Sequence, residues 1–313
     1  MVDAQHYAAV VKASHDAAAS VQGGVNASYI PYLASVPPNL RGLTLVLTDG
    51  QVFSEGDSDF RFAIESISKV ATLALALEQH GPAEVQKKIG ADPTGMPFNS
   101  VTSLELHDDR PQSPLVNAGA MATVSLIQAD DAEDRWARIQ DMQSRLVGHP
   151  VELSEEVNHS EQTTNFHNRA IAWLLFSAGT LYNDPMETCD VYTRQCSTLI
   201  SCRDLAVFGA TLASGGINPL NRERVLQSTN VPHILAEMSM EGLYDSSGDW
   251  AYTVGLPGKS GVGGGVMAVM PGKGAIAGFS PPLDPIGNSV RGQQMVADVA
   301  KALGWNLYRV PEG

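Results

Sequence analysis

The sequence has few cysteines, few positive charges and no long apolar run, and each scarcity excludes a class of protein. Three cysteines occur among 313 residues, all within residues 189–202, and their spacing matches no common zinc motif. We therefore expect reduced, structural thiols and no metal site. Twenty basic residues stand against 34 acidic ones, a formal net charge of −14. This balance disfavours nucleic acid and anionic membranes as partners.

Membrane and secretion signals are also missing from the pattern. The apolar runs near residues 70–77 and 171–176 are too short to span a bilayer. The first six residues lack the basic region that opens a secretion signal. Hydrophobic residues make up 43% of the chain and charged residues 17%, which is the composition of a folded globular protein. The sequence thus predicts a cytoplasmic protein with a substantial core.

Strand patterns lie at both ends of the chain, and a helical pattern lies between them. The dipeptide Asp49-Gly50 is typical of a tight hairpin turn, and Gly81-Pro82 is a helix stop signal. We expect helices over residues 3–20, from 66 to 80 and over 289–303, with mostly helical structure through 66–215. We expect strands over residues 43–48, from 51 to 53, and over 250–254, 265–270 and 275–279.

These elements predict an α/β fold in which an antiparallel sheet flanked by helices is joined to an all-α domain. The sheet domain would be discontinuous, formed by residues 1–65 and 220–313. Residues 66–219 would form the mainly helical domain, with the active site at the junction of the two.

The segment 66–69 reads Ser-Ile-Ser-Lys and is the first candidate for catalysis. Residues three apart share a helix face, so Lys69 can reach the hydroxyl of Ser66. A partly desolvated lysine can take the proton of a serine, which is otherwise a poor nucleophile. The motif is common by chance, and its structural interpretation is a helix N-cap followed by a solvated lysine.

A second motif lies late in the chain, where residues 259–265 read Lys-Ser-Gly-Val-Gly-Gly-Gly. Consecutive glycines allow a backbone to approach a ligand closely. A phosphate cradle is the rival interpretation, but neither the Walker pattern nor a dinucleotide fingerprint is present. An early Ser-x-x-Lys together with a late Lys-Ser-Gly on a strand is the arrangement of penicillin-recognising serine enzymes.

Colinear segments along nearly the whole chain resemble the serine-dependent glutaminase family, whose fold is similar to that of β-lactamases and transpeptidases. Besides the two motifs above, they are residues 29–31, 92–95, 98–100, 117–120, 160–161, 168–169, 192–197, 215–219 and 242–245. The resemblance implies a Ser66 nucleophile, with Lys69 as its base. It also implies an oxyanion hole formed by the backbone N–H groups of Ser66 and Val262, and two tyrosines, Tyr192 and Tyr244, that line the serine and relay protons.

The resemblance further implies hydrolysis of L-glutamine to L-glutamate and ammonia, without a cofactor. Glu161 would pair with the α-ammonium group, while Asn117, Asn168 and Tyr29 would hold the α-carboxylate. These groups suit a zwitterion because they supply one anion and several neutral donors. Relatives form homo-oligomers, so the resemblance implies a homodimer or homotetramer.

Two departures from the family pattern leave alternatives open. Glu65 stands before the serine where many relatives have Gln, and residues 165–168 read Asn-Phe-His-Asn instead of Gly-Asp-Arg-Asn. One alternative function is a serine enzyme acting on β-lactams or peptidoglycan. The other is a glutamine sensor that kept the pocket and lost turnover.

Overall fold

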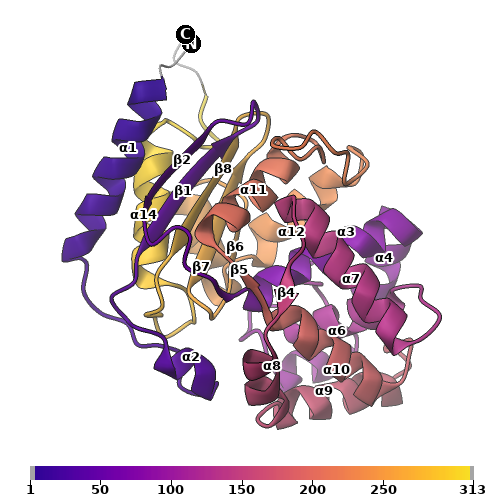
Figure 1. Ribbon diagram of the computed structural model, residues 1–313. Helices are drawn as coiled ribbons and strands as arrows, with labels where there is room; N and C mark the ends of the chain where they lie inside the picture. Colours follow the sequence, from indigo (N-terminus) through magenta and orange to yellow (C-terminus); the bar gives the residue numbers. More distant parts are fainter. Residues whose placement is uncertain (1–3, 311–313) are drawn as a thin grey trace.

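The protein was analysed as a computed structural model that describes residues 4–310 (Figure 1). A five-stranded antiparallel sheet is built from both ends of the chain, in the order β2-β1-β8-β7-β6. A second sheet of three short strands has the order β3-β5-β4. The strands are β1 (Gly42–Leu47), β2 (Val52–Gly56), β3 (Phe62–Ala63), β4 (Glu152–Leu153), β5 (Thr198–Ile200), β6 (Gly258–Ser260), β7 (Gly265–Met270) and β8 (Gly274–Phe279).

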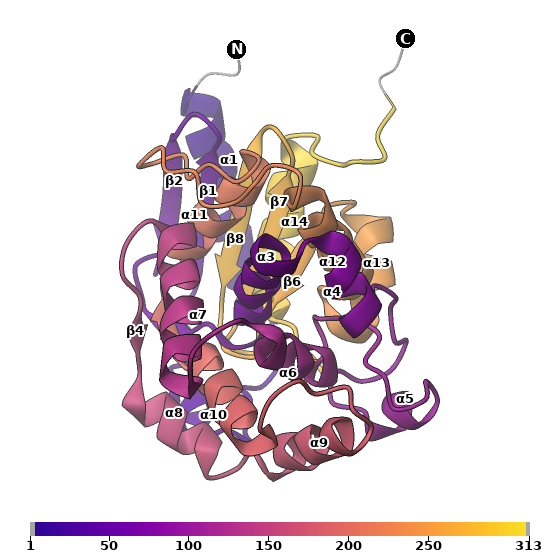
Figure 2. The ribbon, with the colours of Figure 1, turned by 90° about the vertical axis from the view of Figure 1, so that its right-hand side faces the viewer.

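Helices cover both faces of the large sheet and form the rest of the molecule (Figures 1 and 2). The α-helices are α1 (Ala4–Ala17), α2 (Pro31–Ser35), α3 (Ser68–His80), α4 (Pro82–Ile89), α5 (Val101–Glu105), α6 (Asn117–Leu126), α7 (Ala132–Val147), α8 (Glu155–Gln162), α9 (Phe166–Ser177), α10 (Pro185–Cys196), α11 (Cys202–Ala213), α12 (Val231–Glu241), α13 (Ser247–Thr253) and α14 (Val290–Ala302). The 3-10 helices are η1 (Ala18–Ser20), η2 (Glu65–Ile67) and η3 (Tyr244–Ser246). Among residues 4–310, no helix combines the length and apolar character needed to cross a membrane.

The large sheet is buried on both faces, and alternate residues of each strand face different helices. Leu45 and Ile276 pack in one apolar cluster with side chains of α1 and α14. Val46 and Ala275 lie in the other cluster, with side chains of α11. Side chains of a strand alternate between its two faces, so double burial requires apolar residues at consecutive positions. This explains the unbroken apolar runs in β1, β7 and β8.

The predicted fold class is confirmed, and most predicted elements lie within a few residues of the observed ones. The Asp49-Gly50 hairpin joins β1 to β2, with Gly50 at φ +94°. The predicted strand over residues 250–254 is wrong, because this segment belongs to α13. Trp250 and Val254 are buried, one helical turn apart, whereas Tyr252 between them is 91% exposed. The apolar run therefore has helical spacing, which its composition concealed.

The helices that carry predicted site residues begin at strong caps. The side chain of Asp184 accepts hydrogen bonds from the N–H groups of Met186 and Glu187 at the start of α10, and Pro185 occupies the first position. Ser154 caps α8 in the same manner. The short strand β3 leads directly into η2 and α3, and Ile64 N–H donates to Thr198 O at 2.9 Å. The small sheet thereby fixes the entry to the segment 66–69.

Candidate active site

Ser66 and Lys69 lie in contact where η2 passes into α3. Lys69 Nζ donates a hydrogen bond to Ser66 Oγ at 2.5 Å. Ser66 is 7% exposed and Lys69 is 1% exposed. Burial penalises the ammonium form and lowers the pKa of Lys69 to about 8. The neutral amine, which can take the proton of the hydroxyl, is therefore far more populated near neutral pH than in an exposed lysine.

Tyr244 is buried next to Ser66, and its hydroxyl donates a hydrogen bond to Ser260 O at 3.4 Å. Burial raises the pKa of Tyr244, and the hydrogen bond with Ser66 opposes that rise. The residue has φ +54°, and Glu65 has φ +52°. Such values are costly for residues other than glycine, and strained residues of this kind cluster at functional sites.

Lys259 lies over the ring of Tyr244, and within residues 4–310 its hydrogen bonds go to backbone carbonyl groups. Its Nζ lies 4.6 Å from the centroid of the Tyr244 ring. It donates to Gly242 O at 3.0 Å and to Ser260 O at 2.7 Å. The Lys-Ser-Gly motif thus places a fully buried amine behind the tyrosine, held by backbone carbonyl groups, and burial together with the neighbouring Lys69 holds the pKa of Lys259 well below its usual value.

The glycine-rich segment after β6 packs directly against the residues that precede Ser66. A Cβ at Gly261 would lie 2.8 Å from Ile64 O, and a Cβ at Gly263 would overlap the carbonyl oxygen of Ala63. Only glycine permits this approach of two backbones. Val262, between the two glycines, is 6% exposed and is held against the segment that carries the serine.

Two carboxyl groups, those of Glu65 and Glu161, form a buried pair beside Lys69. Burial and the neighbouring Glu161 raise the pKa of Glu65 well above its usual value. Burial also raises the pKa of Glu161 to about 7, while hydrogen bonds from Ser197 and Glu65 oppose the rise. Ser197 Oγ donates to Glu161 Oε1 at 3.2 Å. The two shifts together favour the proton on Glu65 over Glu161.

Asn117, Asn168 and Tyr192 form a hydrogen-bonded chain across α6, α9 and α10. Asn117 Nδ2 donates to Asn168 Oδ1 at 2.9 Å, and the Tyr192 hydroxyl donates to Asn117 Oδ1 at 3.1 Å. Lys69 Nζ lies 5.7 Å from the centroid of the Tyr192 ring. Tyr192 therefore contacts the Lys69 side of the site, with its hydroxyl held by an amide.

A cavity of about 190 Å³ unites four of the predicted binding residues. It is lined by Tyr29, Ile30, Phe98, Asn99, Asn117, Glu161, Thr164, Asn165, His167 and Asn168. The lining that residues 4–310 form around this cavity does not include four other predicted site residues: Ser66, Tyr192, Tyr244 and Val262. Tyr244 contacts the lining through Phe98, whose ring centroid lies 4.8 Å from its own, and Tyr192 contacts it through the hydrogen bond to Asn117.

The sequence did not assign roles to several residues that line this cavity. Asn165 is buried and donates from Nδ2 to Thr193 Oγ1 at 3.0 Å, while its Oδ1 has no partner among residues 4–310. That oxygen is a buried acceptor whose hydrogen-bonding capacity is unused. His167 Nε2 lies 2.7 Å from Asn99 O and so ties α9 to the loop before α5. Both residues lie in the segment 165–168. The departure of this segment from the family pattern was the sequence signal that could have pointed to them.

Comparison with known proteins places this geometry in one family. The family model described as Glutaminase matches residues 24–308. Glutaminase 1 of Shigella flexneri is 66% identical over 309 residues, covering 99% of this chain and 100% of that protein. Glutaminase 1 of Escherichia coli strain K12 is 65% identical with the same coverage. The glutaminase of Bordetella avium is 64% identical and covers 98% of both chains.

Solved structures agree with the sequence comparisons. A probable glutaminase named ybaS superposes with a TM-score of 0.98 at 65% identity, covering 99% of this chain and 100% of that chain. A probable glutaminase from Bacillus subtilis has a TM-score of 0.87 at 29% identity and covers 97% of each chain. Mglu in its glutamate form has a TM-score of 0.90 at 34% identity, covering 98% of this chain and 70% of that one.

Proposed function

The chain belongs to the glutaminase family and is an amidohydrolase, and on that premise we propose that it hydrolyses L-glutamine through an acyl-enzyme on Ser66. The observation that carries the proposal is the 2.5 Å contact between Lys69 Nζ and Ser66 Oγ. Both groups are buried, and the lowered pKa of Lys69 suits a general base. The named relatives are glutaminases, which supports glutamine as the substrate.

In the proposed acylation step, neutral Lys69 takes the proton of Ser66 as Oγ attacks the side-chain carbonyl carbon of glutamine. The oxyanion that forms would accept hydrogen bonds from the backbone N–H groups of Ser66 and Val262. Collapse of this intermediate breaks the C–N bond, and the protonated lysine returns its proton to the leaving ammonia, either directly or through Tyr244. The product of the step is a γ-glutamyl ester of Ser66.

In the proposed deacylation step, a water molecule attacks that ester and glutamate leaves with the serine restored. Tyr244 is buried beside Ser66, and the Lys259 amine lies 4.6 Å from its ring centroid, so the phenol is well placed to relay the water proton. Tyr192 acts from the Lys69 side, where it also orients Asn117.

Substrate binding is assigned to the cavity beside the serine. Ionised Glu161, which lines this cavity, would pair with the α-ammonium group of glutamine. Asn117, Asn168 and Tyr29 would donate to the α-carboxylate. Asparagine, one methylene shorter, would leave either its head group or its amide without partners, so the site should reject it.

The experiment that tests this function is an assay of ammonia release from about 10 mM L-glutamine, above the usual range of KM values. L-Asparagine and a chromogenic cephalosporin serve as comparison substrates. Release from glutamine alone supports the proposal. Turnover of the cephalosporin would favour a β-lactam enzyme, and tight glutamine binding without ammonia would favour a sensor.

We also propose that the chain forms a homodimer or homotetramer in which α9 contributes to the interface. Helix α9 exposes four large apolar side chains, with exposed fractions of 38–70%: Phe166, Trp173, Leu174 and Phe176. A cluster of exposed apolar groups marks an interaction surface. Light scattering at micromolar concentration should give a multiple of the 33.3 kDa chain mass, and Trp173→Glu should lower it. A monomeric wild type would overturn this proposal.

A further inference from the structure

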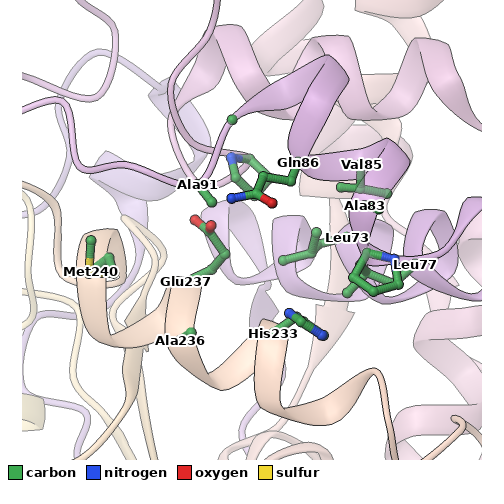
Figure 3. Close-up of a pocket in the computed structure, with 13 residues that line it drawn as sticks. Leu73, Leu77, Ala83, Val85, Gln86, Ala91, His233, Ala236, Glu237 and Met240 are labelled. Atoms are coloured by element: carbon green, nitrogen blue, oxygen red, sulfur yellow. The ribbon is translucent and has the colours of Figure 1, made fainter.

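A second cavity, of about 490 Å³, lies between α3, α4 and α12 (Figure 3). Its residues are Leu73, Leu77, Pro82, Ala83, Val85, Gln86, Gly90, Ala91, Pro114, His233, Ala236, Glu237 and Met240. None of them lines the cavity beside Ser66. The volume is in the range of small-molecule sites, which are mostly apolar with a few directed polar groups.

The directed polar group of this cavity is the carboxyl group of Glu237. Glu237 is 7% exposed, and its Oε2 accepts from Ser113 Oγ at 2.9 Å. Residues 4–310 provide it with no other hydrogen bond and no ion pair. Figure 3 shows the carboxyl group pointing from α12 across the cavity towards Gln86 and Ala91. A buried carboxylate with a single neutral donor is poorly compensated, so a cation beside it would be strongly favoured.

Apart from Gln86 and His233, the other side chains that line the cavity are apolar. Leu73 and Leu77 of α3 and Val85 of α4 are buried side chains that line it on the side away from Glu237 (Figure 3). His233 is exposed at the rim of the cavity. A ligand that fills this space therefore needs an apolar body and one cationic end.

We propose that this cavity is a binding site for a small primary amine, whose ammonium group pairs with Glu237 and whose hydrocarbon body packs on Leu73, Leu77 and Val85. The carboxylate selects an ammonium group over a hydroxyl or a carboxylate group. The apolar residues select a hydrocarbon chain over a polar one.

Two helices that line the cavity, α3 and α12, also lead to residues of the active site. Leu73 lies one helical turn after Lys69 on α3. Helix α12 ends at Glu241, which accepts from Thr94 N–H at 2.8 Å, and the chain then passes through Gly242 to Tyr244. A Cβ at Gly242 would overlap the carbonyl oxygen of Gly258, so the end of α12 is locked against β6. An occupant that shifts α3 or α12 would therefore displace Lys69 or Tyr244.

Isothermal titration of the full chain with n-hexylamine at pH 8 tests the binding site, with n-hexanol and hexanoate as matched ligands. We expect the amine to bind at least about ten-fold more tightly than the alcohol, as for a charge-assisted hydrogen bond. Burial raises the pKa of Glu237 to about 7, so the preference for the amine should decline as the pH falls from 8 to 6 and the carboxylate gains a proton. Equal binding of amine and alcohol, or no saturable binding, would overturn the site.

Three variants make the assignment specific. Glu237→Gln should remove the preference for the amine, whereas Glu84→Gln, on α4 but outside the lining, should retain it. Ala236→Phe adds a ring on the cavity side of α12 and should block binding while the carboxyl group stays in place. If Glu84→Gln weakens binding as much as Glu237→Gln, the ammonium is bound elsewhere.

The coupling to catalysis rests on the proposed glutaminase function, whereas the binding measurement does not. At saturating hexylamine, we expect kcat for glutamine, followed by glutamate formation, to change at least about two-fold in the wild type and not in Glu237→Gln. Saturable binding with an unchanged kcat would overturn the coupling alone. Absence of glutamate formation in every variant would refute the proposed function and leave the calorimetric result intact.

Discussion

Lys69 Nζ donates a hydrogen bond to Ser66 Oγ at 2.5 Å, and these two buried side chains lie one helical turn apart. Among residues 4–310, no carboxylate is hydrogen-bonded to Lys69 Nζ, and the contact with Ser66 explains why this lysine is kept in the interior. Its low-dielectric surroundings favour the neutral amine, which is the form that can accept a proton.

Lys69→Arg should lower kcat/KM by at least about two orders of magnitude, the usual contribution of a general base. Arginine keeps the positive charge but does not deprotonate in proteins. Glutamine binding, measured by calorimetry, should persist because the head-group contacts lie on other residues. A near-normal rate for Lys69→Arg would transfer the role of base to a tyrosine.

Gly263→Ala should lower kcat by about 10²–10³, as for the loss of one oxyanion donor. The new Cβ would overlap the carbonyl oxygen of Ala63, so the segment that carries Val262 has to move away from Ser66. Gly248→Ala is the matched control, because a Cβ there meets no atom within 4 Å. The kcat values of both variants are compared by steady-state kinetics. Equal kcat values for Gly263→Ala and Gly248→Ala would show that Val262 is not held in place by the contact between Gly263 and Ala63.

Glu161→Gln should raise KM for glutamine by about 10- to 100-fold, the equivalent of a hydrogen bond to a charged group. The amide cannot neutralise the α-ammonium group, although it can still accept from Ser197. Glu156→Gln, at an exposed position of the same helix, should leave KM unchanged. An unaltered KM in Glu161→Gln would mean that the ammonium group is bound by other residues.

Glu65→Gln should extend activity to higher pH. The pKa of Glu65 is raised by burial and by Glu161, so the carboxyl group keeps its proton to a higher pH than an ordinary glutamate and loses it as the pH rises further. Its ionisation adds negative charge beside Lys69 and the developing oxyanion, which raises the pKa of Lys69 and opposes attack. Glutamine at this position keeps a donor to Glu161 but cannot ionise. Superimposable pH profiles of kcat for the wild type and Glu65→Gln would contradict this role.

Local sequence signals were sufficient for much of the fold and for the core of the site. The hairpin at Asp49-Gly50 and the i, i+3 spacing of Ser66 and Lys69 depend on neighbours in the chain, and both follow from short-range rules. The strand predicted over residues 250–254 failed because an apolar pentapeptide fits both a buried strand and one face of a helix. Which one forms was decided by the packing of Trp250 and Val254 in the core.

Local sequence patterns do not predict the contacts of the site between residues far apart in the chain. The pairing of Glu65 with Glu161 joins residues 96 positions apart, and nothing near either residue indicates it. The buried carboxyl group of Glu237 is another such case, because α12 alone resembles an ordinary amphipathic helix. Its cavity exists only because α3 and α4 pack around it.

The central claim is the glutamyl ester on Ser66, and rapid-quench mass spectrometry during turnover of L-glutamine tests it most directly. We predict one glutamyl adduct on the peptide that contains Ser66 in the wild type. Ser66→Ala should give neither adduct nor ammonia while it still binds glutamine. An adduct on another residue, or turnover by Ser66→Ala above about a thousandth of the wild-type rate, would contradict the account.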